Sequence, residues 1–235
     1  MIVAIHQPQY LPWLPYFDKA DQADVFVYLD TVQYQKNGVQ NRNQVLTAQG
    51  PKWLTLPVHA SLAHSIRETR LADPRAAVTH ARTIAQEYRR ALFRAWFAEG
   101  LQPILGQSWE TLAEINYATS EWMMEKLGIA TRRVRASELG VSGAGEDLVL
   151  AICRELGATI YLSGTGARAY QSVENFQANG IELRYQAYRN QPYPQCHDTE
   201  FVPDLSALDL LLNLGPDARA TLLAGRTLPE TAPQS

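Results

Sequence analysis

The chain has 235 residues and a mass of 26.3 kDa, long enough for one large domain whose core needs neither disulfides nor metal. Hydrophobic residues make up 46% and charged residues 19% of it, which excludes long disorder, a collagen-like repeat and a coiled coil. With 21 basic and 24 acidic residues the net charge is −3, so no global basic field favours duplex nucleic acid or an anionic membrane. A local basic site is compatible with this balance.

Cysteine and histidine spacing predicts no metal site. Cys153 and Cys196 belong to no ligand motif, and the five histidines share no metal spacing, so we expect neither structural zinc nor a disulfide scaffold, and the sequence assigns no cofactor. The apolar run at the N-terminus is too short for a signal sequence or a membrane span. We therefore expect a cytoplasmic protein without membrane insertion.

The first 30 residues predict a strand, a helix and a second strand. Ile2 to Ile5 form a β-branched apolar run that stops at His6, as a buried strand does. Residues 12–23 carry apolar side chains at helical spacing, and residues 25–29 again have the composition of a buried strand. Because neither strand alternates apolar and polar residues, we expect parallel strands covered on both faces.

A long polar segment follows, at residues 31–49, and it shows no helical periodicity. It leads into a strand-like run at residues 53–58, so it is either a long loop or an irregular hairpin. Loops of this length inside a compact domain are usually functional. We therefore expect the segment to contribute to a binding site.

The middle of the chain, from about residue 73 to 128, is predicted to be helical. Asp73 and Pro74 suit the start of a helix whose apolar residues recur at three- to four-residue steps as far as Trp96. Ser108 suits the N-cap of a second helix, which ends at Gly128.

The last third repeats one order of elements three times. Helical patterns end at Gly128, Gly157 and Gly180, where positive φ is accessible, and strands follow at residues 129–136, 159–162 and 181–185. This alternation predicts an α/β fold with a mainly parallel sheet and flanking helices, Rossmann-like in type. We expect a single domain over residues 1–215 and a mobile tail over residues 216–235.

Ligands of open parallel sheets bind beyond the carboxyl ends of the strands, and this rule nominates three loops. The candidate residues in these loops are His6, Gln7 and Tyr10 after the first strand, Asp30, Lys36, Asn41, Arg42 and Asn43 after the second, and Ser163, Gly164 and Gly166 after residue 162.

The residue types suggest roles at an anion-binding site. His6 could titrate near neutrality or donate to a ligand oxygen, or equally fix backbone carbonyls. Asp30 is a candidate base, metal ligand or ribose partner. Lys36 and Arg42, beside amide side chains, suit an anionic substrate group, the alternative being a solvated loop. The amides of residues 163–166 could cradle a phosphate or carboxylate at a helix N-terminus, or simply form a tight turn.

Several motifs together resemble those of the WbqC-like protein family. The motifs are His6 to Trp13 with Tyr16 and Phe17, Asp30 with Gln33, Tyr34 and Lys36, Asn41 to Asn43, Ser163 to Ala167 with Tyr170, Tyr193 with Gln195, and residues 203–215. The resemblance implies a place beside surface-polysaccharide or O-antigen synthesis functions, and it adds Tyr170 to the substrate-binding candidates. By fold analogy the N-terminus also looks like the nucleotide-binding α-hydrolase group, although the paired histidines of that group are absent.

These observations favour a transferase-like enzyme, acting on surface-polysaccharide precursors, that binds an anionic, nucleotide-linked or acyl-activated small molecule. In this hypothesis His6, Asp30 and Lys36 are catalytic, mainly through positioning and charge stabilisation. A non-catalytic binding or scaffold protein of a polysaccharide assembly system is the alternative. Nucleic-acid binding is disfavoured by the acidic balance.

Overall fold

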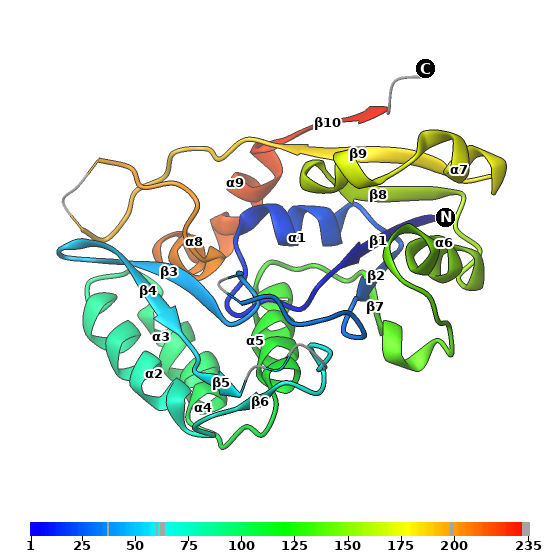
Figure 1. Cartoon of the computed structure of the whole chain (residues 1–235). Coiled ribbons are helices and arrows are strands. Elements are labelled where there is room, and N and C mark those ends of the chain that lie inside the picture. The colour runs from blue at the N-terminus through cyan, green and yellow to red at the C-terminus, as the bar shows by residue number, and fades with distance from the viewer. Residues whose placement is uncertain (37, 60, 62–63, 198–199, 232–235) are drawn as a thin grey trace.

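A six-stranded sheet lies at the centre of the computed structural model (Figure 1), which describes residues 1–36, 38–59, 61, 64–197 and 200–231. The strand order is β10-β9-β8-β1-β2-β7, and neighbours run parallel except for β10, which is antiparallel to β9 at one edge. The bounds are β1 Ile2–His6, β2 Val25–Tyr28, β7 Arg132–Arg135, β8 Ile160–Gly164, β9 Glu182–Tyr188 and β10 Arg226–Thr231.

The sheet separates two hydrophobic cores. Val3 and Ile5 point into a core shared with the helices α6 and α7, whereas Ala4 and Phe26 point into a core shared with α1, α5, α8 and α9. Strands buried on both faces explain the unbroken apolar runs in the sequence. The helices are α1 Leu14–Asp21, α5 Leu112–Lys126, α6 Gly145–Glu155, α7 Val173–Ala178, α8 Ala207–Leu214 and α9 Ala218–Ala224.

The direction in which strands are added reverses between β1 and β8. From β1 the chain adds β2 and then β7 on one side, and it later adds β8 and β9 on the other side of β1. In open α/β sheets, loops diverge at such a switch point and leave room for a ligand. The α/β class with a mainly parallel, Rossmann-like sheet is confirmed.

The three glycines predicted to end helices do so. Gly128, Gly157 and Gly180 have φ of 66°, 67° and 70° and follow α5, α6 and α7 by two residues. Glycine adopts this left-handed conformation at no steric cost, so each helix stops and the chain turns into the next strand.

Between β6 and β7 the chain forms several helices, and their ends differ from the predicted ones. The helix expected to reach Trp96 stops at Glu87, where Tyr88 leaves the helical conformation (φ −92°, ψ 19°); the Tyr88 hydroxyl bonds to Asp209 (2.8 Å). Helix α5 is capped by Thr111 in a capping box and not by Ser108. Besides α5, these elements are α2 Ala76–Glu87, α3 Arg94–Trp96, the π-helix η1 Phe97–Leu101 and α4 Gln102–Leu105.

The polar segment at residues 31–49 contains a strand, so of the two alternatives the hairpin is the one the structure has. Residues 42–47 pair with residues 50–55 as an antiparallel hairpin. Its inward positions include Asn43, whose amide donates to the Leu11 carbonyl (2.7 Å), so a polar composition concealed buried strand positions. The strands outside the main sheet are β3 Arg42–Thr47, β4 Gly50–Thr55, β5 Val58–His59 and β6 Arg70–Leu71.

The expectation of a mobile tail from residue 216 is wrong for residues 216–231. They form α9, which buries Ala218 and Leu222, and the edge strand β10. The physical reason is a pair of short ion pairs that Arg226 makes with Asp18 (2.7 Å) and Asp21 (2.6 Å) of α1. Residues 232–235 lie outside the described residues. Three 3-10 helices complete the chain: η2 Ala136–Glu138, η3 Thr165–Tyr170 and η4 Gly215–Asp217.

Candidate functional site

The switch point between β1 and β8 brings His6 and Gly164 together at the carboxyl ends of these two central strands. We call this end of the sheet the edge. Ala4 pairs with Leu162 in parallel register, and the next residues of both strands continue to these two positions. The His6 ring packs edge-on against Tyr16 (4.9 Å between centroids), and its Nδ1 lies 3.1 Å from the Gln7 carbonyl oxygen. That contact requires a proton on Nδ1, which leaves Nε2 of the neutral ring as an acceptor.

Lys19 is the residue at this edge that sequence reasoning missed. It lies on α1 with 3% of its surface exposed, and its Nζ donates to the Ile5 carbonyl (3.2 Å). A Cβ atom placed on Gly164 would lie 3.8 Å from the same nitrogen. The buried amine therefore joins α1, β1 and the end of β8 at one point.

No carboxylate in the described part of the chain lies within ion-pair distance of the Lys19 amine. Its sequence neighbour Asp18 is occupied by Arg226 and Gln186. Burial accordingly lowers the pKa of Lys19 from 10.5 to about 7, since an ammonium group loses hydration without gaining a counter-charge. Such a group is suited to receive an anion from solution or to act as a neutral base.

The charge of Lys19 influences His6, the second titratable group at this edge. Burial, and then the positive charge of Lys19, lower the pKa of His6 well below its usual value, against a smaller opposing effect of the Gln7 carbonyl. His6 is therefore neutral at physiological pH. The site thus combines a partly charged amine with a neutral imidazole.

The polar segment after β2 reaches this edge through its amide side chains. Gln40 donates to the Gln7 side chain (2.7 Å) and accepts from the Gln35 backbone amide (2.8 Å), and Asn116 of α5 donates to the Gln40 carbonyl (2.8 Å). The polar segment therefore contacts the first loop, as we expected. The side chains that make these contacts are glutamines, whereas we expected Lys36 and Arg42.

Four of the predicted substrate-binding residues make contacts with other parts of the protein. Tyr10 is fully buried and its hydroxyl lies 2.9 Å from Nδ1 of His80. The amide groups of Asn41 and Asn43 donate to the carbonyls of Leu56 and Leu11 (2.8 and 2.7 Å), and the Arg42 guanidinium lies over the Trp53 ring at 4.6 Å. Of these contacts, the bond from Asn43 to Leu11 joins the β3–β4 hairpin to the first loop, and the bond of Tyr10 joins that loop to α2.

Of the two remaining candidates after β2, Lys36 lies on the surface and Asp30 is buried. Lys36 is exposed. Asp30 is 1% exposed and accepts three hydrogen bonds, from the Tyr117 hydroxyl (2.9 Å) and from the amide and hydroxyl of Ser137 (3.0 and 2.6 Å). A buried carboxylate saturated in this way fixes the turn after β7, so its geometry favours a structural role.

The loop after β8 differs from the α-helix N-terminus that we expected. Residues 165–170 form the 3-10 helix η3, and α7 begins only at Val173, because Ser172 is the residue that caps a helix there (3.2 Å to the Asn175 amide). Ser163 is 1% exposed, whereas Gly166 is exposed and Tyr170 is 82% exposed. Of this group, Gly164 is the residue beside Lys19.

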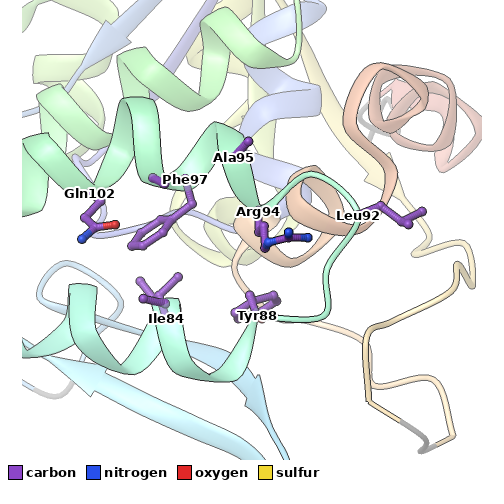
Figure 2. A pocket seen from close by; sticks show the side chains of 9 residues that line it. Ile84, Tyr88, Leu92, Arg94, Ala95, Phe97 and Gln102 are labelled. Atoms are coloured by element: carbon purple, nitrogen blue, oxygen red, sulfur yellow. The ribbon is translucent and has the colours of Figure 1, made fainter.

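Two hollows in the described part of the chain lie away from the switch point. One, of about 500 Å³, lies between residues 31–33 and the start of α6, and another, of about 380 Å³, lies between α2 and the helices α3 to η1 (Figure 2). Within the described residues, no group of three or more His, Cys, Asp or Glu side chains could hold a metal ion. In the same part of the chain, no helix combines the length and apolarity needed to cross a bilayer.

Comparison with known proteins places the chain in a family. A family model described as the WbqC-like protein family matches residues 7–221. The chain is also 33% identical, over 222 residues, to the uncharacterized protein Rv1507c of Mycobacterium tuberculosis, covering 92% of this chain and 95% of that protein. No solved structure matches the chain significantly. The chain belongs to the WbqC-like protein family.

Proposed function

We propose that this member of the WbqC-like protein family is a transferase that binds the anionic group of an activated small molecule beyond the carboxyl ends of β1 and β8. The observation that carries the proposal is the Lys19 amine, which is buried at the switch point of the sheet without a carboxylate partner in the described residues. A buried cation without a counter-charge lowers the stability of the folded protein. A bound anion would supply that counter-charge.

Each group at the edge has a role in this proposal. Lys19 binds the phosphate or carboxylate of the ligand. Gly164 carries no side chain, so the ligand can approach within van der Waals distance of the amine. The neutral His6 presents Nε2 as a hydrogen-bond acceptor toward the ligand, and it is held by Tyr16 and the Gln7 carbonyl. Catalysis would come mainly from positioning and charge stabilisation.

The cation assignment changes from the one expected from the sequence. Lys36 and Arg42 were the expected anion-binding residues, but Lys36 is exposed and Arg42 stacks on Trp53. We assign the anion to Lys19 and give Asp30 a positioning role in the turn after β7. The family resemblance supports a substrate from surface-polysaccharide precursor metabolism, either nucleotide-linked or acyl-activated.

Ligand-induced melting shifts test the proposal. The wild type would be screened against nucleotides, nucleotide sugars and acyl-coenzyme A thioesters, and a ligand at 100 times its Kd stabilises the folded state by about 2.7 kcal/mol. We expect the shift to vanish in Lys19→Met and to persist in Lys36→Ala and Lys52→Met. Absence of a shift with every anionic ligand would reject the substrate class, and loss in Lys36→Ala alone would reject Lys19 as the binding cation.

A further inference from the structure

The turn between α2 and α3 presents one leucine to solvent in a fixed orientation. Leu92 is 81% exposed, while its two neighbours are held inward. Ala91 is buried, the Phe93 amide donates to the Leu212 carbonyl (2.9 Å), and the Phe93 ring lies where a Cβ on Gly215 would clash at 2.4 Å. The turn is thus anchored on α8, and Leu92 extends from an anchored backbone.

Arginines surround this leucine. Arg89, Arg90 and Arg94 are all exposed, and in the described part of the chain none of them forms an ion pair with a carboxylate. Arg89 donates to the Gln86 carbonyl at the end of α2 (3.2 Å), which orients its guanidinium. The neighbouring Glu87 accepts from the Ala48 amide (3.1 Å) and lies 3.9 Å from His197 Nε2. We call Arg89, Arg90, Leu92 and Arg94 the basic turn.

An apolar hollow opens beside the basic turn. It has a volume of about 380 Å³ and its walls include Ile84, Phe97 and Ala98. Figure 2 shows Leu92 at one end of this hollow and Gln102 at the other. A second hollow of about 390 Å³ shares Ala98 and Gln102 with the first and adds Arg82. Because they share these two residues, we call the two hollows together the apolar groove; Arg82 and Arg94 line it, and the exposed Glu99 follows Ala98.

We propose that the basic turn binds the surface of an anionic phospholipid bilayer. Leu92 would enter the interface between headgroups and acyl chains, and the three guanidinium groups would bind lipid phosphates around it, as arginine favours. The apolar groove would then face the headgroup region. This association is peripheral, and it adds a location to the proposed function without depending on it.

The shape of the patch decides between a bilayer and a protein partner. The groove walls mix alanines with larger side chains such as Ile84 and Phe97, so the walls alone do not separate the two partners. The most exposed apolar group of the patch, Leu92, extends from a turn, which a deformable bilayer accommodates better than a folded surface does. Charge complementarity applies to both partners, so the experiment must separate them.

Vesicle co-sedimentation tests the proposal. The full chain would be mixed with vesicles of phosphatidylcholine alone and of phosphatidylcholine with phosphatidylglycerol. We expect binding only to the anionic vesicles, weakened on the order of 100-fold when Arg89, Arg90 and Arg94 are all changed to Gln, which is about fivefold per arginine. Leu92→Gln should weaken binding about tenfold.

Matched variants control for exposed residues of the same types. Leu228 is 90% exposed on β10, and Arg154 is exposed on α6, so Leu228→Gln and Arg154→Gln should leave vesicle binding unchanged. Unchanged circular dichroism and melting temperature would show that the basic-turn variants are folded. Equal binding to neutral vesicles, or equal loss in the control variants, would overturn the proposal. Retention on immobilised polyglutamate without vesicle binding would assign the basic turn to an acidic protein.

Discussion

Replacement of Lys19 by Met should stabilise the protein below pH 7. Each pKa unit is worth about 1.4 kcal/mol, so the fall of the Lys19 pKa from 10.5 to about 7 corresponds to at most about 5 kcal/mol of unfolding free energy. The variant also loses the hydrogen bond to Ile5, worth about 1 kcal/mol. Structural relaxation around the buried amine reduces the remaining cost in the wild type. We therefore expect the unfolding free energy of Lys19→Met to exceed that of the wild type by about 2–4 kcal/mol.

The gain should depend on pH in a defined direction. Below pH 7 the amine is charged in both the folded and the unfolded state, so the folded wild type bears the whole cost of burial. Between pH 7 and 10.5 the folded Lys19 has lost its proton while the unfolded one keeps it, so the wild type becomes more stable as the pH rises. The advantage of the methionine variant therefore shrinks through this window.

Urea unfolding of the wild type and Lys19→Met at about pH 6, 8 and 10 measures this difference directly. Lys52→Met, which changes an exposed lysine on β4, should show a small difference that does not vary with pH. The reasoning is refuted if Lys19→Met is less stable than the wild type at pH 6, or if its difference from the wild type is the same at all three values.

A second measurement on Lys19→Met and two further variants test other parts of the structure. In Lys19→Met the NMR-detected pKa of His6 should rise, since a nearby positive charge is removed. An unchanged pKa would show that the charge of Lys19 does not act on His6. Asp30→Asn should lower the unfolding free energy by about 1–3 kcal/mol, because two of three buried hydrogen bonds end on one carboxylate oxygen; a neutral effect in urea would argue against a structural role. Gly215→Ala should cost more than about 2 kcal/mol, owing to its φ of 53° and the Phe93 ring; a melting temperature equal to that of wild type would contradict this.

The centre of the fold could be predicted because its strands are apolar throughout. Residues 2–5 and 25–29 were recognisable as buried strands, and the glycine-terminated helices implied a parallel sheet. The rule that ligands bind at strand ends then selected His6, Gln7 and Gly164 without any contact information. Polar elements were harder, because β3 buries Asn43 through a hydrogen bond that only the folded chain reveals.

Lys19 could not be singled out from the sequence for a physical reason. Within a helix, a lysine between Phe17 and Ala20 is usually exposed or extends its amine to water. Its burial depends on the Ile5 carbonyl and on Gly164, which come from two strands separated by more than 150 residues of chain. Long-range pairing of this kind leaves no local pattern.

Two aspartates on the polar side of α1 form ion pairs with arginines that lie about 200 residues later in the chain. Asp18 and Asp21 bind Arg226, and Asp21 also binds Arg219 (2.8 Å). During synthesis, when the N-terminal part of a chain emerges first, Asp18 has the amides of Gln22 and later Gln186 as side-chain donors, and the arginines that pair with the two aspartates lie 198 to 208 residues further along the chain. The helix that carries Lys19 therefore gains its charged partners only once residues 219 and 226 have been synthesised.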